Sequence, residues 1–171
     1  MELSLLFQII STSAVILGII FGILNLRNFQ KMRKREAAIL MLNSFQTTEF
    51  VRGLLIVFGL PDDADKAEIE ALPKEDYSAF YVLLGTWERL GILVYHSEIP
   101  LDLVTEAFSG AILTSWEKLR NFVFQFRADV KREAAFEWFQ WLAERIGERD
   151  QASSIMPAYV IHKNWKRNRF E

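Results

Sequence analysis

The sequence predicts an all-α protein: one N-terminal transmembrane helix that continues into a stalk, followed by a cytoplasmic helical bundle. Three observations support this class. Residues 3–26 contain no charged side chain and no histidine. Later segments repeat their apolar residues every three or four positions, and no segment alternates long enough to form a sheet. We divide the 171 residues into a span (1–26), a basic stalk helix (27–46), a helical domain (47–149) and a basic, aromatic tail (150–171).

The uncharged N-terminal segment has three interpretations. A signal peptide has a basic start, a shorter apolar centre and a small-x-small cleavage site, whereas this chain begins Met-Glu and shows no such site. A buried core helix rarely stays uncharged for 24 residues. At 1.5 Å per residue the segment is roughly 36 Å long, enough to cross a hydrocarbon layer of about 30 Å with some tilt. We therefore interpret it as a membrane span.

Five basic residues directly follow the span, and none precedes it. They are Arg27, Lys31, Arg33, Lys34 and Arg35. Because cytoplasmic flanks of membrane helices are enriched in Lys and Arg, we expect the N-terminus outside and the large domain in the cytoplasm. The same residues are candidate contacts for lipid headgroups, at about 1 kcal/mol each on an anionic surface. The alternative is that they only set the topology.

Small and polar residues recur along one face of the span. They are Ser11, Ala14, Gly18, Gly22 and Asn25. Lipid tails are as apolar as leucine, so helices in a bilayer associate through close backbone contact, which small residues permit. We expect this face to pack against another helix, either from a second copy or from a larger membrane partner. The alternative is chance, since glycine is common in membrane spans.

The helical pattern continues beyond the span and then breaks twice. Good helix formers extend the stalk to about Leu42. Thr47 or Thr48 is expected to cap a new helix, "TEFVRGLLIVFG", which ends before Pro61. In the acidic segment that follows, Asp62 and Asp63 are expected to cap a short helix that Pro73 stops.

Three further helices complete the expected domain. Apolar residues recur at helical spacing from Tyr77, and Pro100 begins the next helix, with a bend expected at Ser109-Gly110. The last helix is expected to be "REAAFEWFQWLAERIG", ending at Gly147. Each contains Glu beside Arg or Lys, as in Glu88-Arg89, which is typical of a solvent-exposed helix face.

The aromatic residues of the last helix cannot share one face. One stripe is expected in the core: Phe136, Phe139, Ala143 and Ile146. The adjoining face holds Trp138, Trp141 and Leu142. This second face is either core as well or a surface for a protein partner, because Trp is a favoured anchor in interfaces.

Charge divides the chain into three zones: residues 1–35 carry +4, residues 36–150 carry −9, and residues 151–171 carry +3. The tail combines basic residues with Tyr159, Trp165 and Phe170, which suits a membrane interface. It could equally fold back on the acidic domain or be a solvated end. The acidic domain argues against a nucleic-acid partner.

No motif in the sequence indicates catalysis, a cofactor or a metal. The chain has no cysteine and only two histidines, His96 and His162, neither with companions at metal-ligand spacing. Phosphate-binding and dinucleotide-binding glycine patterns are absent, as is the G-x-S-x-G motif. An Asp63-x-Asp65 calcium loop lacks the glycine and the acid ladder that such loops require. We therefore expect a protein that is not an enzyme and has no cofactor.

Several quoted segments resemble a bacterial family known only as a domain of unknown function. They are "REAAILMLNSFQTTEFVRGLLIVF", "WERLGILV", "LVTEAFSGAILTSWEKLRNFV" and "FEWFQWLAERI". The resemblance runs from the stalk to about Arg149, and the tail lies outside it. It implies a single-span protein of the bacterial inner membrane with a cytoplasmic all-helical domain, and no reaction.

The first functional hypothesis is a membrane-anchored interaction module, an accessory or scaffold subunit of a bacterial membrane assembly. Its expected partners are membrane lipid and either a membrane protein or a second copy of the chain. The alternative is a membrane-tethered regulator that senses a signal through its acidic domain. An enzyme with a site assembled across helices is the third hypothesis.

Overall fold

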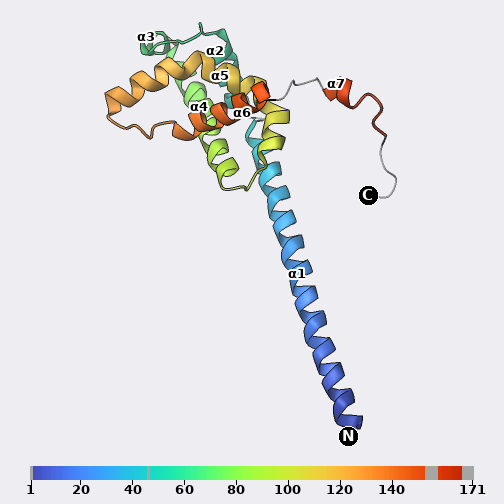
Figure 1. Cartoon of the computed structure of the whole chain (residues 1–171). Helices are drawn as coiled ribbons and strands as arrows, with labels where there is room; N and C mark the ends of the chain where they lie inside the picture. Colours follow the sequence, from blue (N-terminus) through green and yellow to red (C-terminus); the bar gives the residue numbers. More distant parts are fainter. Residues whose placement is uncertain (1, 46, 153–157, 167–171) are drawn as a thin grey trace.

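The computed structural model describes residues 2–45, 47–152 and 158–166. The chain is 81% helical, and the described ranges contain no strand, so the predicted all-α class is confirmed. A long helix carries a helical body at one end (Figure 1). The elements are α1 (Glu2–Phe45), α2 (Thr48–Gly59), α3 (Lys66–Glu70), the 3₁₀ turn η1 (Lys74–Asp76), α4 (Tyr77–Tyr95), α5 (Leu101–Val130), α6 (Glu137–Ala152) and α7 (Ala158–Ile161).

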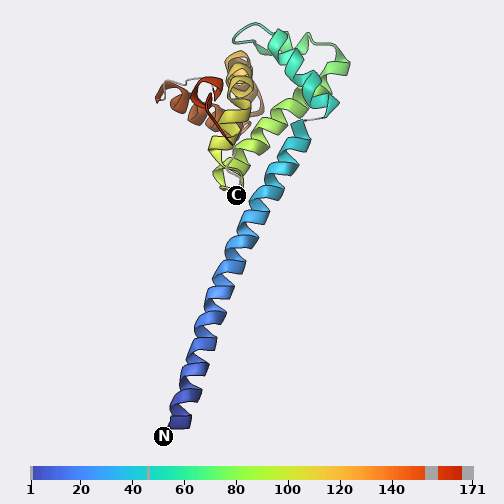
Figure 2. The same cartoon turned by 90° about the vertical axis from the view of Figure 1, so that its right-hand side faces the viewer.

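Helix α1 is one uninterrupted rod that leaves the body at its C-terminal end (Figure 2). It reaches Phe45, three residues beyond the expected end of the stalk, because no Gly or Pro interrupts it between residues 23 and 45. Its segment Thr12–Phe29 is long and apolar enough to cross a membrane, and the body buries none of it.

The last residue of α1 belongs to the core of the body. Phe45 is 9% exposed, and its ring centroid lies 4.8 Å from Phe50, 5.5 Å from Trp87 and 4.0 Å from Phe108. These rings come from α2, α4 and α5. The end of the long helix is therefore fixed to three elements of the body through aromatic packing.

Helix α4 lies at the centre of the body, with α2 and α6 packed against it and α5 against both of those helices. Its side chains Phe80, Leu84 and Trp87 are fully buried. The approach of α2 to α4 requires glycine at position 53, because a Cβ atom there would lie 2.3 Å from the carbonyl oxygen of Ala79.

The loop between α2 and α3 is inserted into the hydrogen-bond ladder of α5. The backbone N–H of Ala64 donates to the carbonyl of Lys118 (2.7 Å), and the N–H of Phe122 donates to the carbonyl of Ala64 (3.1 Å). Ala64 thus connects the carbonyl of Lys118 with the N–H of Phe122, two groups that a regular helix would join by one direct hydrogen bond. Such insertions bend helices, and α5 curves as it crosses the body (Figure 1).

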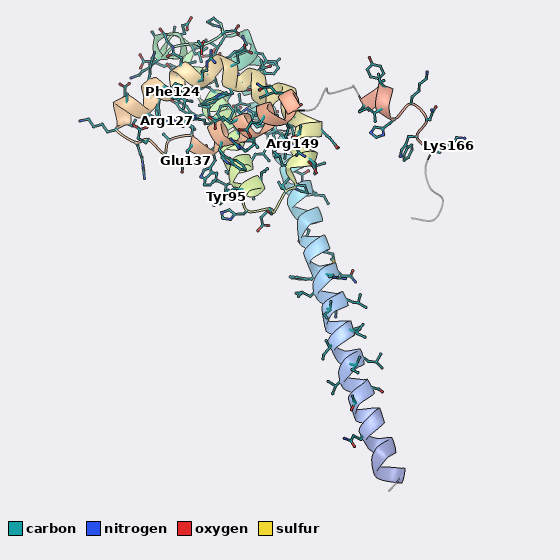
Figure 3. All side chains as sticks on the ribbon, viewed as in Figure 1. Tyr95, Phe124, Arg127, Glu137, Arg149 and Lys166 are labelled. Carbon is teal, nitrogen blue, oxygen red and sulfur yellow. The ribbon has the colours of Figure 1, made fainter. Side chains whose placement is uncertain are left out.

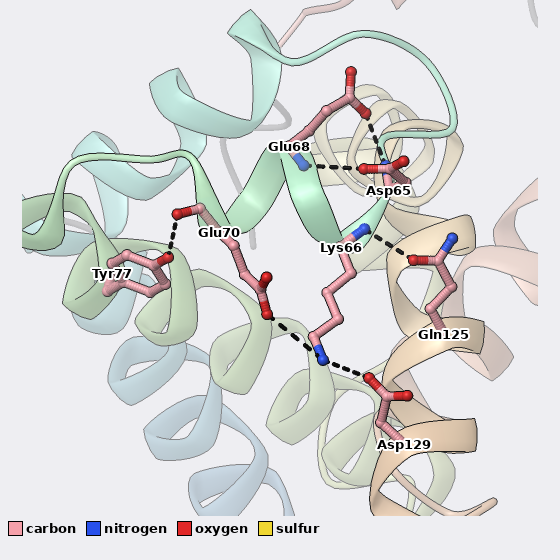
Figure 4. Close-up of polar contacts among 7 residues, drawn as sticks. All are labelled: Asp65, Lys66, Glu68, Glu70, Tyr77, Gln125 and Asp129. Carbon is pink, nitrogen blue, oxygen red and sulfur yellow. Dashed lines mark hydrogen bonds and ion pairs between the residues drawn. The ribbon is translucent and has the colours of Figure 1, made fainter.

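The expected cap of α3 is wrong. Asp65 caps this helix, not Asp62 or Asp63: its carboxylate accepts from the N–H of Glu68 (2.9 Å), and the Glu68 carboxylate accepts from the N–H of Asp65 (2.8 Å) (Figure 4). Asp62 and Asp63 instead form ion pairs with α5, to Lys118 and Arg120. Docking of the loop on α5 delays the start of the helix.

The bend expected at Ser109-Gly110 does not interrupt α5, which is helical from Leu101 to Val130. The expected bounds of the last helix are wrong. The final helix begins at Glu137 and passes through Gly147 to Ala152. Residues 131–136 are a connection instead, because α5 ends at Val130 and the next residue, Lys131, is left-handed with a φ of 52°.

Candidate functional site

The first turn of α6 is capped by a side chain from another helix. Phe136, the residue before α6, has no side-chain oxygen that could accept a hydrogen bond from the N–H groups of the first turn. The Glu88 carboxylate of α4 accepts a hydrogen bond from the N–H of Phe139 (2.8 Å). The backbone amide of Trp138 also interacts with this carboxylate and favours its ionised form. Glu88 therefore supplies the acceptor that an Asp or Ser normally provides at the N-cap position. The solvent-exposed role expected for Glu88 is wrong.

Burial raises the pKa of the Glu88 carboxyl above its ordinary value. The backbone amides of Phe139 and Trp138 and the charge of Arg127 act in the opposite direction, while Glu137 adds to the increase. The ionised carboxylate thus stabilises α6 at the cost of its own desolvation.

A close backbone contact fixes α6 on α4 one turn further along. Gly91 is buried, and a Cβ atom at this position would lie 2.3 Å from the carbonyl oxygen of Trp138. Only glycine permits this approach without a shift of one helix. Together, the Glu88 cap and the Gly91 contact determine where the side chain of Trp138 emerges.

Arg127 holds the connection between α5 and α6. It is 9% exposed; its Nε donates to the carbonyl of Ala135 (2.8 Å) and its Nη1 to the Gln140 side chain (2.7 Å). The connection contains two left-handed non-glycine residues, Lys131 (φ 52°) and Phe136 (φ 54°). Conformations of this kind cost about 1–3 kcal/mol each and persist only where the surroundings impose them.

Three aromatic rings from α4 and α6 meet at the surface beside this junction. Tyr95 lies 4.7 Å from Trp138 and 5.9 Å from Trp141, and the two tryptophan rings are 6.0 Å apart. Tyr95 is 55% exposed and both tryptophans are half-buried. We call Tyr95, Trp138 and Trp141 the aromatic cluster. Figure 3 shows Tyr95 at the edge of the body, where α4 ends.

One residue of the predicted partner surface is not at the surface. Leu142 is fully buried in the core with Phe139, so its assignment to this surface is wrong. It follows Trp141 by only 100° around the helix, which is enough to turn it from the surface to the interior. Sequence reasoning missed Tyr95, because no local pattern shows that the end of α4 lies beside the start of α6.

A cavity of about 490 Å³ also borders Glu88. Its lining is mostly apolar: Glu88, Phe126, Val130, Arg132, Ala134, Ala135 and Phe136. Glu88 is the one carboxylate in this lining. Acid–base catalysis by paired carboxylates would need a second one. In the ranges described, no group of three His, Asp or Glu residues is placed to hold a metal ion.

The other predicted site residues lie on α1 and in the tail. Ala14, Gly18, Gly22, Asn25 and Arg27 are exposed, and nothing lies within 4 Å of a Cβ atom placed on either glycine. The side chains of Ser11, Lys31, Arg33, Lys34 and Arg35 lie outside the described part of the chain. In the tail, Tyr159 (80%) and Trp165 (70%) are exposed, and Phe170 lies outside the described residues.

We expect Glu88→Ala to lower the free energy of unfolding by about 1–2 kcal/mol, as loss of an N-cap does, because the amide of Phe139 loses its acceptor. Glu88→Gln retains an acceptor and removes the charge. Both variants can be compared by urea unfolding of the full chain in detergent, followed by tryptophan fluorescence.

The difference in unfolding free energy between the wild type and Glu88→Gln should depend on pH in one definite direction. Since folding raises the pKa of Glu88, the folded state binds a proton more tightly than the unfolded state. The stabilisation is complete below the ordinary pKa of 4.5 and is lost as pH rises through the raised value. The stability of the wild type minus that of Glu88→Gln should therefore fall across this window; a difference that rises would contradict the assigned environment.

The fold and the surface define a class of protein: an all-helical body with an exposed aromatic cluster, joined to one long apolar N-terminal helix. The model of the family described as Domain of unknown function (DUF4760) matches residues 12–146. The chain therefore belongs to this family, and the resemblance to a domain of unknown function is confirmed. No curated protein and no solved structure matches it.

Proposed function

We propose that this protein is a membrane-anchored interaction module, an accessory or scaffold subunit of a membrane assembly in the bacterial inner membrane. Helix α1 crosses the membrane with its N-terminus outside, and the body lies in the cytoplasm. The aromatic cluster binds a cytoplasmic segment of a protein partner.

The observation that carries this proposal is the continuity of α1 from the apolar segment to Phe45. The apolar side chains are exposed by 47–67% between Val15 and Phe29, which is unfavourable in water and favourable in lipid. The family match begins at residue 12 and includes this segment, which supports its interpretation as a retained membrane span. The five basic residues that follow favour a cytoplasmic body.

A rigid anchor presents the body at a fixed distance from the bilayer. Residues 30–45 continue as a helix for roughly 24 Å beyond the apolar segment. Tyr95 and the two tryptophans are then held by packing and by the Glu88 cap. Aromatic side chains on a preorganised surface are favoured anchors for protein partners.

The test is purification from native membranes in mild detergent, comparing the wild type with Tyr95→Ser and the control Tyr81→Ser. Both tyrosines are exposed side chains of α4, by 55% and 43%. We expect a partner to co-purify with the wild type and the control, and its recovery to fall at least fivefold with Tyr95→Ser. A monomer at every concentration, or equal recovery from all three chains, would contradict the proposal.

One observation favours a regulator as the second candidate. The cavity beside Glu88 lies against the left-handed Phe136, so protonation or occupation there would act directly on the start of α6. Such a regulator should change its tryptophan emission as pH passes the raised pKa of Glu88. Identical pH profiles for the wild type and Glu88→Gln would oppose it.

A further inference from the structure

The part of α1 between the apolar segment and the body exposes large apolar side chains on one face. Met32 is 62% exposed and Ile39 51%, and Phe29, the last residue of the apolar segment, is 60% exposed on the same face. At 100° per residue they lie within about 60° of the direction of Gly18. Met32 and Ile39 lie beyond the end of the apolar segment, so burial in the hydrocarbon layer does not explain their exposure.

The spacing along this face is that of a coiled coil. Asn25, Phe29, Met32, Glu36, Ile39 and Asn43 are separated by 4, 3, 4, 3 and 4 residues. An average of 3.5 residues keeps one seam in contact with a parallel neighbouring helix. The described side chains at all six positions are exposed. We call these six positions the stalk seam.

The body leaves the stalk seam free. Phe45, which packs into the core, lies about 180° around the helix from Gly18 and from Glu36. The helix register also places Arg27 about 180° away from Gly18. A second helix on the seam would therefore meet neither the body nor Arg27.

We propose that the stalk seam binds a second copy of this chain, as a parallel two-stranded coiled coil. This inference rests on the proposed function, because two copies inserted in the same orientation and at the same depth meet residue for residue. Phe29, Met32 and Ile39 then face their equivalents. Asn25 and Asn43 carry amides that both donate and accept, so each is self-complementary and fixes the register.

The same geometry continues into the apolar segment. Ala14, Gly18 and Gly22 lie on the same face of α1 as the stalk seam, and each is within about 40° of the mean direction of the three. Close contact between small residues suits the lipid layer, where apolar burial gives no gain. Large apolar residues suit the aqueous layer, where burial drives association. The change in side-chain size along one face matches the change in solvent.

Glu36 is the unfavourable position in this seam. In a parallel pair the two Glu36 carboxylates face each other, and like charges at such positions oppose association. Replacement by leucine should therefore strengthen the pair, whereas Ile39→Asp should weaken it. Neither residue contacts the core, so both variants retain the folded body.

The chain has no cysteine, so disulfide crosslinking can map the seam in the full-length protein. Single cysteines replace Gly18, Met32, Ile39 and Asn43 on the face, and Ile16, Ile23 and Ala38 on the opposite side as controls. Oxidation in membranes joins only positions whose Cβ atoms approach to about 4.5 Å. Coexpression of two forms with different tags identifies the second copy through a dimer of intermediate mass.

We expect face positions to form disulfide dimers at least fivefold more than controls, in both the apolar segment and the stalk. Glu36→Leu should increase the Met32→Cys dimer, and Ile39→Asp should reduce it. Three results would overturn the pairing of two copies through the stalk seam. These are equal crosslinking at face and control positions, crosslinking confined to the apolar segment, and adducts to another protein only. If any of these results is obtained with the chain still in the membrane, the proposed function is unaffected. Recovery of the chain in the soluble fraction would contradict both the pairing of two copies and the proposed function.

Discussion

Phe45→Ala should lower the free energy of unfolding of the body by about 3–5 kcal/mol, the usual cost of truncating a buried phenylalanine. Phe45 contributes an almost fully buried ring to a cluster with Phe50, Trp87 and Phe108. The chain remains helical around position 45, but α1 loses its main attachment to the body. The stalk should then become cleavable by protease between α1 and α2.

The matched control is Leu24→Ala on the same helix. Leu24 is 53% exposed in the apolar segment and touches no part of the body. Urea unfolding followed by tryptophan fluorescence does not report on α1, because all five tryptophans lie at or after residue 87, four of them in the body and Trp165 in the tail. Equal midpoints for Phe45→Ala and Leu24→Ala would show that α1 is not packed into the core.

Gly91→Ala should have the second large effect, destabilising the body by about 3 kcal/mol, at the upper end of the usual cost of overpacking. The added methyl group would lie 2.3 Å from the backbone carbonyl of Trp138, and a helix backbone cannot yield as a side chain can. Helix α6 must move away, which also weakens the Glu88 cap.

Gly85→Ala is the control in the same helix. Nothing lies within 4 Å of a Cβ atom at residue 85, and alanine is the better helix former by about 0.5–1 kcal/mol. We therefore expect this variant to be neutral or slightly more stable than the wild type. The unfolding midpoint of Gly91→Ala should lie well below the wild-type value, and that of Gly85→Ala at or slightly above it. If Gly91→Ala were as stable as Gly85→Ala, α4 and α6 would not be in close contact.

Local signals predicted the helices and several of their ends. The Thr47 cap is confirmed: its hydroxyl accepts from the N–H of Phe50 (3.2 Å). Pro100 does precede the helix it was expected to begin, and Gly59 is the last residue of α2. Such ends depend on residues within one turn, which a sequence shows directly.

Contacts between residues far apart in the chain could not be predicted from the sequence. Glu88 and Phe139 are 51 positions apart, and Ala64 and Phe122 are 58 apart, so no local pattern relates them. The contact between Glu88 and Phe139 makes a charged residue of α4 the cap of α6. The contact between Ala64 and Phe122 moves the start of α3 away from Asp62. Both errors arise because tertiary packing overrides local preference.

The candidate surface was predicted in part. Trp138 and Trp141 were singled out by composition and are half-buried beside Tyr95, whereas Leu142 is in the core. Tyr95 joins them only because Gly91 lets α6 approach α4. Ala14, Gly18 and Gly22 of α1 are exposed, and their role stays a prediction.

Labelling of single cysteines tests the central claim most directly. Glu2→Cys and Glu98→Cys place one thiol before the apolar segment and one in a loop of the body in a chain that otherwise has none. A membrane-impermeant maleimide is applied to intact spheroplasts and to lysed ones. We predict that the Glu2→Cys chain is labelled before lysis and the Glu98→Cys chain only afterwards. Labelling of Glu98→Cys in intact spheroplasts, or recovery of the protein in the soluble fraction, would contradict the account.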